Sequence, residues 1–125
     1  GYALQAIIYL ARKRSRTNYI SLTELAENLD IPKHYAAKVL QTLSRHKLIK
    51  SHKGPNGGFK SIEQAPAIAL YTIIKAIEPH SFISETGFNL APSVDKTTCP
   101  FQYILKDHIR DMQQVLSNTT ISSYL

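Results

Sequence analysis

Basic side chains are concentrated in the first half of the sequence, where they could bind a polyanion. Residues 1–64 hold 11 Lys and Arg against 4 Asp and Glu, a net charge of +7. Residues 65–125 hold 4 against 5, a net charge of −1. A basic segment joined to a near-neutral one predicts a module for a polyanion such as nucleic acid, attached to a part with another task.

The polar and cationic residues of this segment form two groups. One lies on the outward face of a predicted helix from Pro32 to about His46: Lys33, His34, Tyr35, Lys38, Gln41 and Arg45. The other surrounds a glycine-rich loop: Lys50, His52, Lys53, Gly54, Pro55, Asn56, Gly57, Gly58 and Lys60. A helix with an apolar back and a polar front can read base edges, and a slim basic hairpin can hold a minor groove or the phosphates.

Either group alone is compatible with an ordinary solvated surface, but their order along the chain favours DNA. We expect Lys33, His34 and Lys38 to contact the major groove, with Tyr35, Gln41 and Arg45 in support. The segment from Lys53 to Lys60 is then expected to contact the adjacent minor groove or the backbone.

Other chemistry has little support in this sequence. The five histidines show no metal-ligand spacing, and Gly54 to Gly58 is not followed by the Gly-Lys-Ser/Thr of a nucleotide-binding loop. No nucleophile–base constellation stands out, so no enzyme and no cofactor are predicted. One cysteine excludes an intrachain disulfide framework and fits a reducing cytoplasm. We expect no signal peptide and no membrane span, and we expect native residues before Gly1 to be missing.

The elements that position these groups follow from periodicity and punctuation. Apolar residues at helical spacing predict helices over residues 2–14, 22–29, 32–46 and 69–78. Ser21 and Glu24 form a predicted capping box, and Asp30-Ile31-Pro32 separates the second helix from the third. Strands are predicted from Leu48 to His52 and from Gly58 to Ile62, with Asn56 and the three loop glycines at positive φ and Pro55 at a turn corner. The fold class is mainly α with a β-hairpin wing, a winged helix-turn-helix.

A long apolar stripe marks the last helix, predicted from Pro100 to Asn118, with a short turn after it up to Leu125. Seven residues make up the stripe: Phe101, Ile104, Leu105, Ile109, Met112, Val115 and Leu116. A small monomer has no reason to expose such a stripe, so we expect it to pair two subunits. The division is then 1–79 for the DNA-binding domain, 80–99 for an irregular effector-type loop, and 100–125 for the dimerisation helix and its terminal turn.

Several motifs resemble those of a known family. Ile31-Pro32-Lys33-His34-Tyr35, the segment from Lys38 to Leu43, Leu48-Ile49-Lys50-Ser51 and Gly54-Pro55-Asn56-Gly57-Gly58-Phe59 are similar to the bacterial winged-helix regulators of the IscR, NsrR and CymR type, the Rrf-two family. The resemblance implies a homodimeric transcriptional regulator whose long C-terminal helix pairs the subunits. It also implies a loop before that helix that often carries three cysteines for an iron–sulfur cluster.

This chain departs from that pattern in the loop. Residues 80–98 contain no cysteine, and Cys99 stands alone where the family's last cluster cysteine would be. Gln102 occupies the position of a cluster histidine in some members. Because clusters are held by several thiolates, no iron–sulfur cluster and no metal site are predicted. Cys99 is interpreted as a small apolar residue without a sensing role, or alternatively as a redox-active thiol at a helix start.

The sequence thus predicts a sequence-specific DNA-binding regulator, most simply a repressor, that acts as a homodimer on an imperfect palindromic operator. One alternative keeps DNA binding and makes Cys99 a redox or nitrosative switch. Another, from a different class, is a winged-helix module that uses its hairpin on an acidic protein partner. The operator, the regulated genes and the effector are not encoded in any motif.

Overall fold

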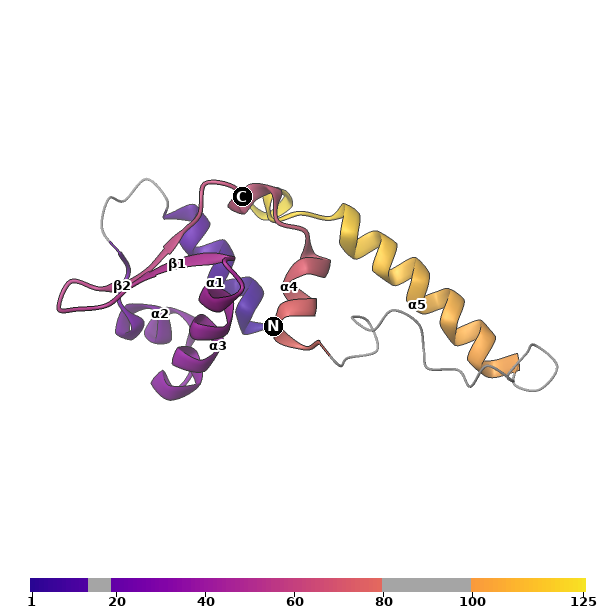
Figure 1. Ribbon diagram of the computed structural model, residues 1–125, viewed down its shortest axis with the longest axis horizontal. Coiled ribbons are helices and arrows are strands. Elements are labelled where there is room, and N and C mark those ends of the chain that lie inside the picture. The colour runs from indigo at the N-terminus through magenta and orange to yellow at the C-terminus, as the bar shows by residue number, and fades with distance from the viewer. Residues whose placement is uncertain (14–18, 80–99) are drawn as a thin grey trace.

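The computed structural model describes residues 1–13, 19–79 and 100–125, without the side chains of residues 100–106. Its elements follow one another in the predicted order (Figure 1). They are α1 (Tyr2–Arg12), α2 (Leu22–Leu29), α3 (Lys33–Arg45), β1 (Ile49–His52), β2 (Gly58–Ser61), the 3₁₀ turn η1 (Ala65–Ala67), α4 (Leu70–Ile77), α5 (Pro100–Asn118) and the 3₁₀ turn η2 (Ile121–Tyr124). The predicted class, mainly α with a β-hairpin wing, is confirmed. Element ends differ from the prediction by at most two residues.

The core lies where the apolar faces of the first three helices meet. Leu10 of α1, Leu25 of α2 and Leu40 and Leu43 of α3 are almost completely buried. The 3.6-residue period places the apolar residues of each helix on one face, and these faces pack together. Burial of α3's apolar back leaves its opposite face to solvent.

Local signals set where α2 and α3 begin. The Ser21 hydroxyl accepts a hydrogen bond from the Glu24 amide at 3.1 Å, which confirms one half of the predicted capping box. The Glu24 carboxylate accepts from the Tyr9 hydroxyl at 3.1 Å, and this ties α2 to α1. Asp30 adopts the left-handed conformation that ends α2, and Pro32 precedes α3. The turn between these two residues joins α2 to α3.

The wing is an antiparallel pair with Lys50 opposite Lys60 and Ser51 opposite Phe59. A turn closed by the Gly57 amide on the Gly54 carbonyl, at 3.0 Å, joins its strands. The predicted positive φ holds for Gly54 and Gly58 and is wrong for Asn56 and Gly57. Pro55 and Asn56 are the central residues of this turn, and a type I turn places both at negative φ.

Two glycines of the wing are required by close backbone approaches. A Cβ at Gly57 would overlap the backbone carbonyl of His52, so this glycine is needed for space and not for its φ. Gly58 combines φ +153° with a backbone approach to Ile20. Ile20 and Phe59 exchange backbone hydrogen bonds at 2.8 Å in both directions, which anchors the wing to the segment before α2.

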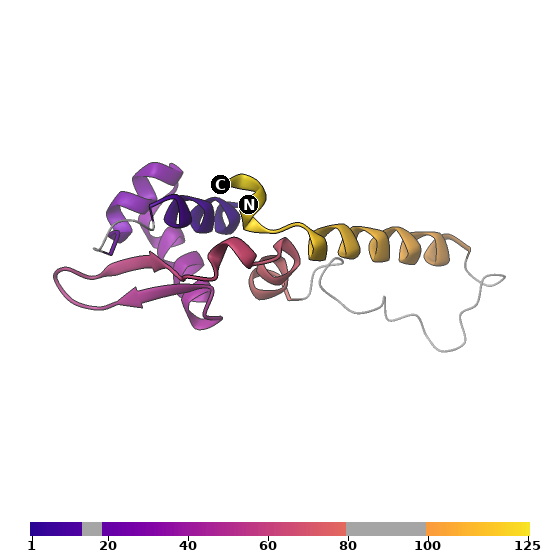
Figure 2. The ribbon, with the colours of Figure 1, turned by 90° about the horizontal axis from the view of Figure 1, so that it is seen from above.

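The C-terminal end returns to the winged-helix core. The Leu70 amide donates to the Thr119 carbonyl and the Ile121 amide to the Ile68 carbonyl, both at 2.9 Å. Ile121 is fully buried, and the Arg12 guanidinium donates to the Tyr124 carbonyl at 2.7 Å. The C-terminal end of α5 lies at the body, and the helix extends away from the body toward its N-terminal end in two perpendicular views (Figures 1 and 2). The base of α5 is therefore fixed to the domain, and its far part projects from it.

Candidate nucleic-acid interface

The outward face of α3 carries the polar residues that the sequence assigned to it. Lys33, His34, Lys38, Gln41 and Arg45 are all exposed. On the opposite face Ala36, Leu40 and Leu43 are fully buried, so α3 cannot rotate about its axis without losing its core contacts. A fixed helix with polar side chains along its outer face has the form of a recognition helix.

Tyr35 differs from its neighbours on α3. It is 44% exposed, and its ring meets that of Tyr2 edge to face with centroids 5.8 Å apart. Such aromatic pairs are favourable beyond the area they bury. Tyr35 thus links α3 to the start of α1, and this contact limits the positions that its hydroxyl can reach.

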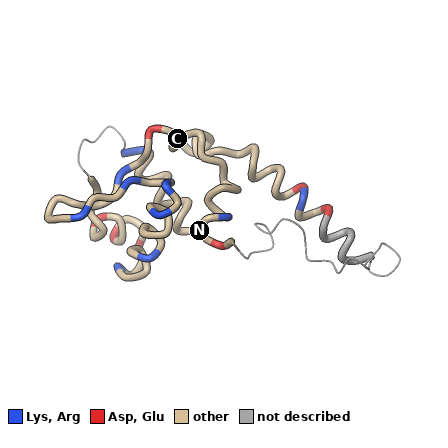
Figure 3. Tube along the Cα trace, in the orientation of Figure 1, with Lys and Arg blue, Asp and Glu red and all other residues tan. Residues whose placement is uncertain are grey.

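The outer face of the wing gathers several cations. Lys50 and Lys60 are cross-strand neighbours, and the repulsion between two like charges in this position destabilises a sheet. The His52 ring stacks on Tyr19 with centroids 5.3 Å apart, and the Lys60 ammonium lies 5.9 Å from the centre of the same Tyr19 ring. Figure 3 shows that Lys and Arg residues are spread over α3 and the hairpin. The surface therefore suits a polyanion.

Sequence reasoning did not identify Tyr19, which organises this face of the wing. It belongs to the connection before α2. Its partners His52 and Lys60 follow it in the sequence by 33 and 41 positions. An aromatic residue in a connection has no period that could indicate such contacts. Ser44 and Ser51 were also missed, although the Ser44 hydroxyl donates to that of Ser51 at 2.8 Å and joins α3 to β1.

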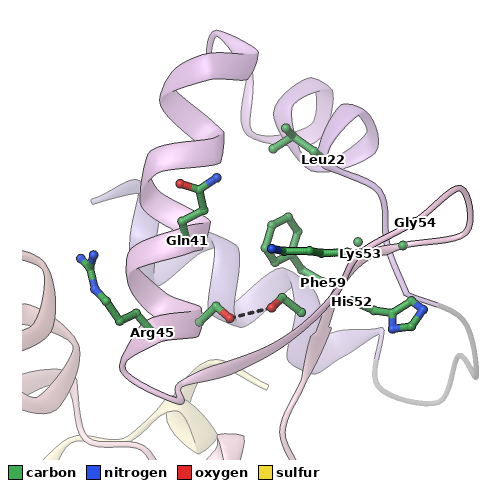
Figure 4. Close-up of a pocket in the computed structure, with 11 residues that line it drawn as sticks. Leu22, Gln41, Arg45, His52, Lys53, Gly54 and Phe59 are labelled. Carbon is green, nitrogen blue, oxygen red and sulfur yellow. Dashed lines mark hydrogen bonds between the residues drawn. The ribbon is translucent and has the colours of Figure 1, made fainter.

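A cleft of about 460 Å³ separates α3 from the wing (Figure 4). Gln41, Ser44 and Arg45 line it from α3, and Lys53 and Phe59 line it from the wing side. In the close-up, Lys53 extends from the wing toward α3, whereas the ring of His52, which also lines the cleft, points away from it. The structure thus brings the end of the predicted recognition helix and the predicted wing to one shared opening.

The predicted dimer residues divide along α5. Met112 and Val115 are 46% and 63% exposed, while Ile109 is buried and Leu116 packs against the chain's own core. The side chains of Phe101, Ile104 and Leu105 lie outside the described residues, as does Cys99 with the whole predicted loop 80–99. His108, on the same helix, is exposed. Of the predicted stripe, Met112 and Val115 are the exposed members within the described part of α5.

The described residues contain neither a candidate metal site nor a candidate membrane span. In residues 1–13, 19–79 and 100–125 no three His, Cys, Asp or Glu side chains come together in a way that could hold a metal ion. Within the same ranges, no helix combines the length and the apolar character needed to cross a bilayer.

The family comparison covers the whole chain. Residues 1–125 match the family model named Rrf2 and described as an iron-dependent transcriptional regulator. A protein of Aquifex aeolicus that carries the name of an HTH-type transcriptional regulator is 38% identical over 74 residues, which are 59% of this chain and 50% of that relative. The chain thus spans about half the length of this curated relative.

Solved structures with the same fold include two CymR proteins. The chain is 31% identical to Staphylococcus aureus CymR with a TM-score of 0.69, and the match covers 97% of this chain and 89% of that one. CymR (YrzC), the global cysteine regulator of B. subtilis, has a TM-score of 0.77 at 23% identity, with 99% and 92% covered. At that identity the second match supports the fold alone.

Proposed function

The chain belongs to the Rrf2 family, which its motifs resemble, and we propose that it represses transcription as a homodimer on an imperfect palindromic operator. Members of this family are DNA-binding transcriptional regulators of the winged-helix type and not enzymes. The proposal concerns what family membership leaves open: the assembly, the direction of regulation, the DNA contacts and the cofactor.

The observation that carries the DNA contacts is the common cleft of α3 and the wing. Lys33, His34 and Lys38 lie on the exposed face of α3, and Lys53 extends over the cleft from the wing. If α3 enters a major groove, the wing lies over the adjacent minor groove, as in other recognition-helix modules. Base reading is then assigned to α3, and most of the sequence-independent affinity to the wing.

The homodimer is supported by the exposed apolar residues of α5. Met112 and Val115 lie three residues apart on one face of a helix that projects from the body. At about 1.5 Å per residue, the 19 residues of α5 extend for roughly 28 Å, long enough for an antiparallel pair. A two-fold dimer would place two copies of α3 about one DNA turn apart, roughly 34 Å, which calls for a palindromic operator.

An iron–sulfur cluster does not fit the donors that residues 1–125 supply. The family is described as iron-dependent, but these residues contain one cysteine, Cys99. Clusters are normally held by about four thiolates, and two subunits would supply two. We therefore include in the proposal that operator binding takes place without a cluster.

Selection of bound sequences from a random duplex pool tests the DNA part directly. The expected result is an enriched inverted repeat whose half-sites are about one helical turn apart. Sedimentation of the free protein at micromolar concentration should give a dimer. Recovery of no common motif would contradict sequence-specific binding, and a stable monomer would contradict the assembly.

The cluster part has a separate test. Protein purified without oxygen should be colourless and should lack stoichiometric iron and sulfide. Cys99→Ser should leave operator affinity within about threefold of the unaltered protein under reducing conditions, since the proposal gives Cys99 neither a ligand nor a DNA contact, and substitutions that remove no such contact usually change free energies by about 0.5 kcal/mol or less. Stoichiometric iron and sulfide would overturn this part of the proposal.

A further inference from the structure

The cleft between α3 and the wing lies where a DNA backbone would have to pass. In a duplex, one sugar–phosphate backbone separates each major groove from the adjacent minor groove. A protein that places a helix in the first and a hairpin in the second must let that backbone run between the two elements. In this chain the space between them is the 460 Å³ cleft, which is open to solvent.

The chemistry of the cleft matches that occupant. Gln41 projects from α3 and Lys53 from the wing, and Figure 4 shows both over the opening from opposite sides. An amide group and an ammonium group are both hydrogen-bond donors to phosphate oxygens. The apolar side chains of Phe59 and Leu22 also line the cleft, and they suit the carbon-rich faces of deoxyribose. Donors beside apolar surface therefore match a chain that alternates phosphate and sugar.

We propose that this cleft seats one stretch of operator backbone and that Gln41 and Lys53 bind the same phosphate. The inference rests on the proposed function, because the cleft acquires this occupant only when α3 and the wing engage one duplex. It changes the role expected for Gln41, which the sequence placed among the residues supporting base contacts. Gln41 binds the backbone here, and one phosphate joins the helix to the wing.

Arg45 has a different role in this arrangement. It follows Gln41 by one helical turn and also lines the cleft, but in Figure 4 its side chain turns away from Lys53. Its guanidinium therefore adds positive potential beside the opening without pointing at Lys53. The shared phosphate is therefore assigned to Gln41 and Lys53, one residue from each element.

The test scans the operator with duplexes that each carry one uncharged methylphosphonate in place of a phosphate. Binding of the unaltered protein, Gln41→Ala and Lys53→Ala is measured on every duplex, and Lys75→Ala on α4 serves as a control that removes one charge outside the cleft. One position per half-site should weaken the unaltered protein by about fivefold, an effect of the size of an exposed ion pair. At that position Gln41→Ala and Lys53→Ala should each lose only about twofold, since each variant already lacks one of the two contacts that the phosphate makes.

The outcomes separate this inference from the proposed function. If Gln41→Ala and Lys53→Ala both show a reduced loss at the same phosphate while Lys75→Ala keeps the full fivefold loss, the shared phosphate is supported. If the loss is reduced at different phosphates in the two variants, or at none, the shared phosphate is wrong although DNA binding stands. If the unaltered protein binds no duplex, the proposed function fails, and this inference fails with it.

Discussion

The helices α3 and α5, for which DNA contact and dimer contact are proposed, are both amphipathic but differ in which face their own chain covers. On α3 the apolar residues Ala36, Leu40 and Leu43 are fully buried, and the cationic residues and Gln41 are exposed. On α5, apolar residues Met112 and Val115 are 46% and 63% exposed. The chain's own core covers the apolar face of α3, whereas part of the apolar face of α5 remains exposed to solvent.

This difference indicates what each helix can bind. A helix whose apolar side is used up in the core can offer only its polar side, which suits a hydrated, charged ligand such as DNA. A helix that keeps apolar side chains in solvent gains free energy by burying them against another protein surface. The proposals of DNA on α3 and of a second copy of the chain on α5 rest on this contrast.

The largest expected effect is on the buried face of α3. Leu40→Ala removes a fully buried side chain, so the free energy of unfolding should fall by about 2–5 kcal/mol. Lys38→Ala, on the exposed face of the same helix, should change it by about 0.5 kcal/mol or less. Denaturant unfolding measures both values. Equal costs for the two variants would mean that α3 is not fixed by its apolar back.

The second effect concerns the exposed apolar face of α5. Val115→Glu would place an unpaired charge in the proposed interface, so we expect a monomer with operator affinity about 100-fold lower, because a monomer engages one half-site. Gln114→Glu adds the same charge at an exposed neighbouring position that points away from Val115 and should leave the dimer intact. Sedimentation and operator titration distinguish them. A Val115→Glu dimer would remove the contrast between the two helices.

Periodicity predicted the two faces of α3 well, because burial repeats with the helical turn. It gave this helix an apolar back and an outward polar face, and the structure buries Leu40 and Leu43 on the first of these. It could not show that Leu116 packs against its own chain, because α4 and α5 meet through residues that are far apart in sequence.

Tertiary contacts between unlike elements account for most of what the sequence did not indicate. The placement of Ile121 in the core depends on a backbone bond to Ile68, which no side-chain pattern encodes. Tyr19 reaches the wing from a connection without a period, and the cleft exists only once α3 and the hairpin are both in place. Gly57 was correctly placed in the turn, but it was expected there for a positive φ. It is required because a Cβ would overlap the His52 carbonyl, and such crowding appears only in the folded structure.

The third prediction divides the DNA-binding surface itself. Lys38→Ala on α3 should reduce discrimination at one base pair of each half-site by about tenfold, within the range of a good side-chain–base contact. Lys60→Ala on the wing should weaken operator and scrambled duplex alike and lower the magnitude of the log–log salt slope by up to about 1. Binding to both duplexes over a range of salt concentrations measures the two effects. Identical behaviour of the variants would show that helix and wing do not differ in role.

The smallest effect is expected at the hydrogen bond that joins α3 to the wing. The Ser44 hydroxyl donates to the Ser51 hydroxyl at 2.8 Å beside the cleft, so it sets how far the wing stands from α3. Ser44→Ala and Ser51→Ala should each weaken operator binding about two- to threefold, the lower end of what one hydrogen bond contributes. Because both changes remove the same bond, the double variant should be no weaker than either single one. Ser123→Ala, an exposed hydroxyl on η2, should have no effect on the same titration. If the two losses multiply instead, each hydroxyl contacts DNA by itself, and the width of the cleft is set by other contacts.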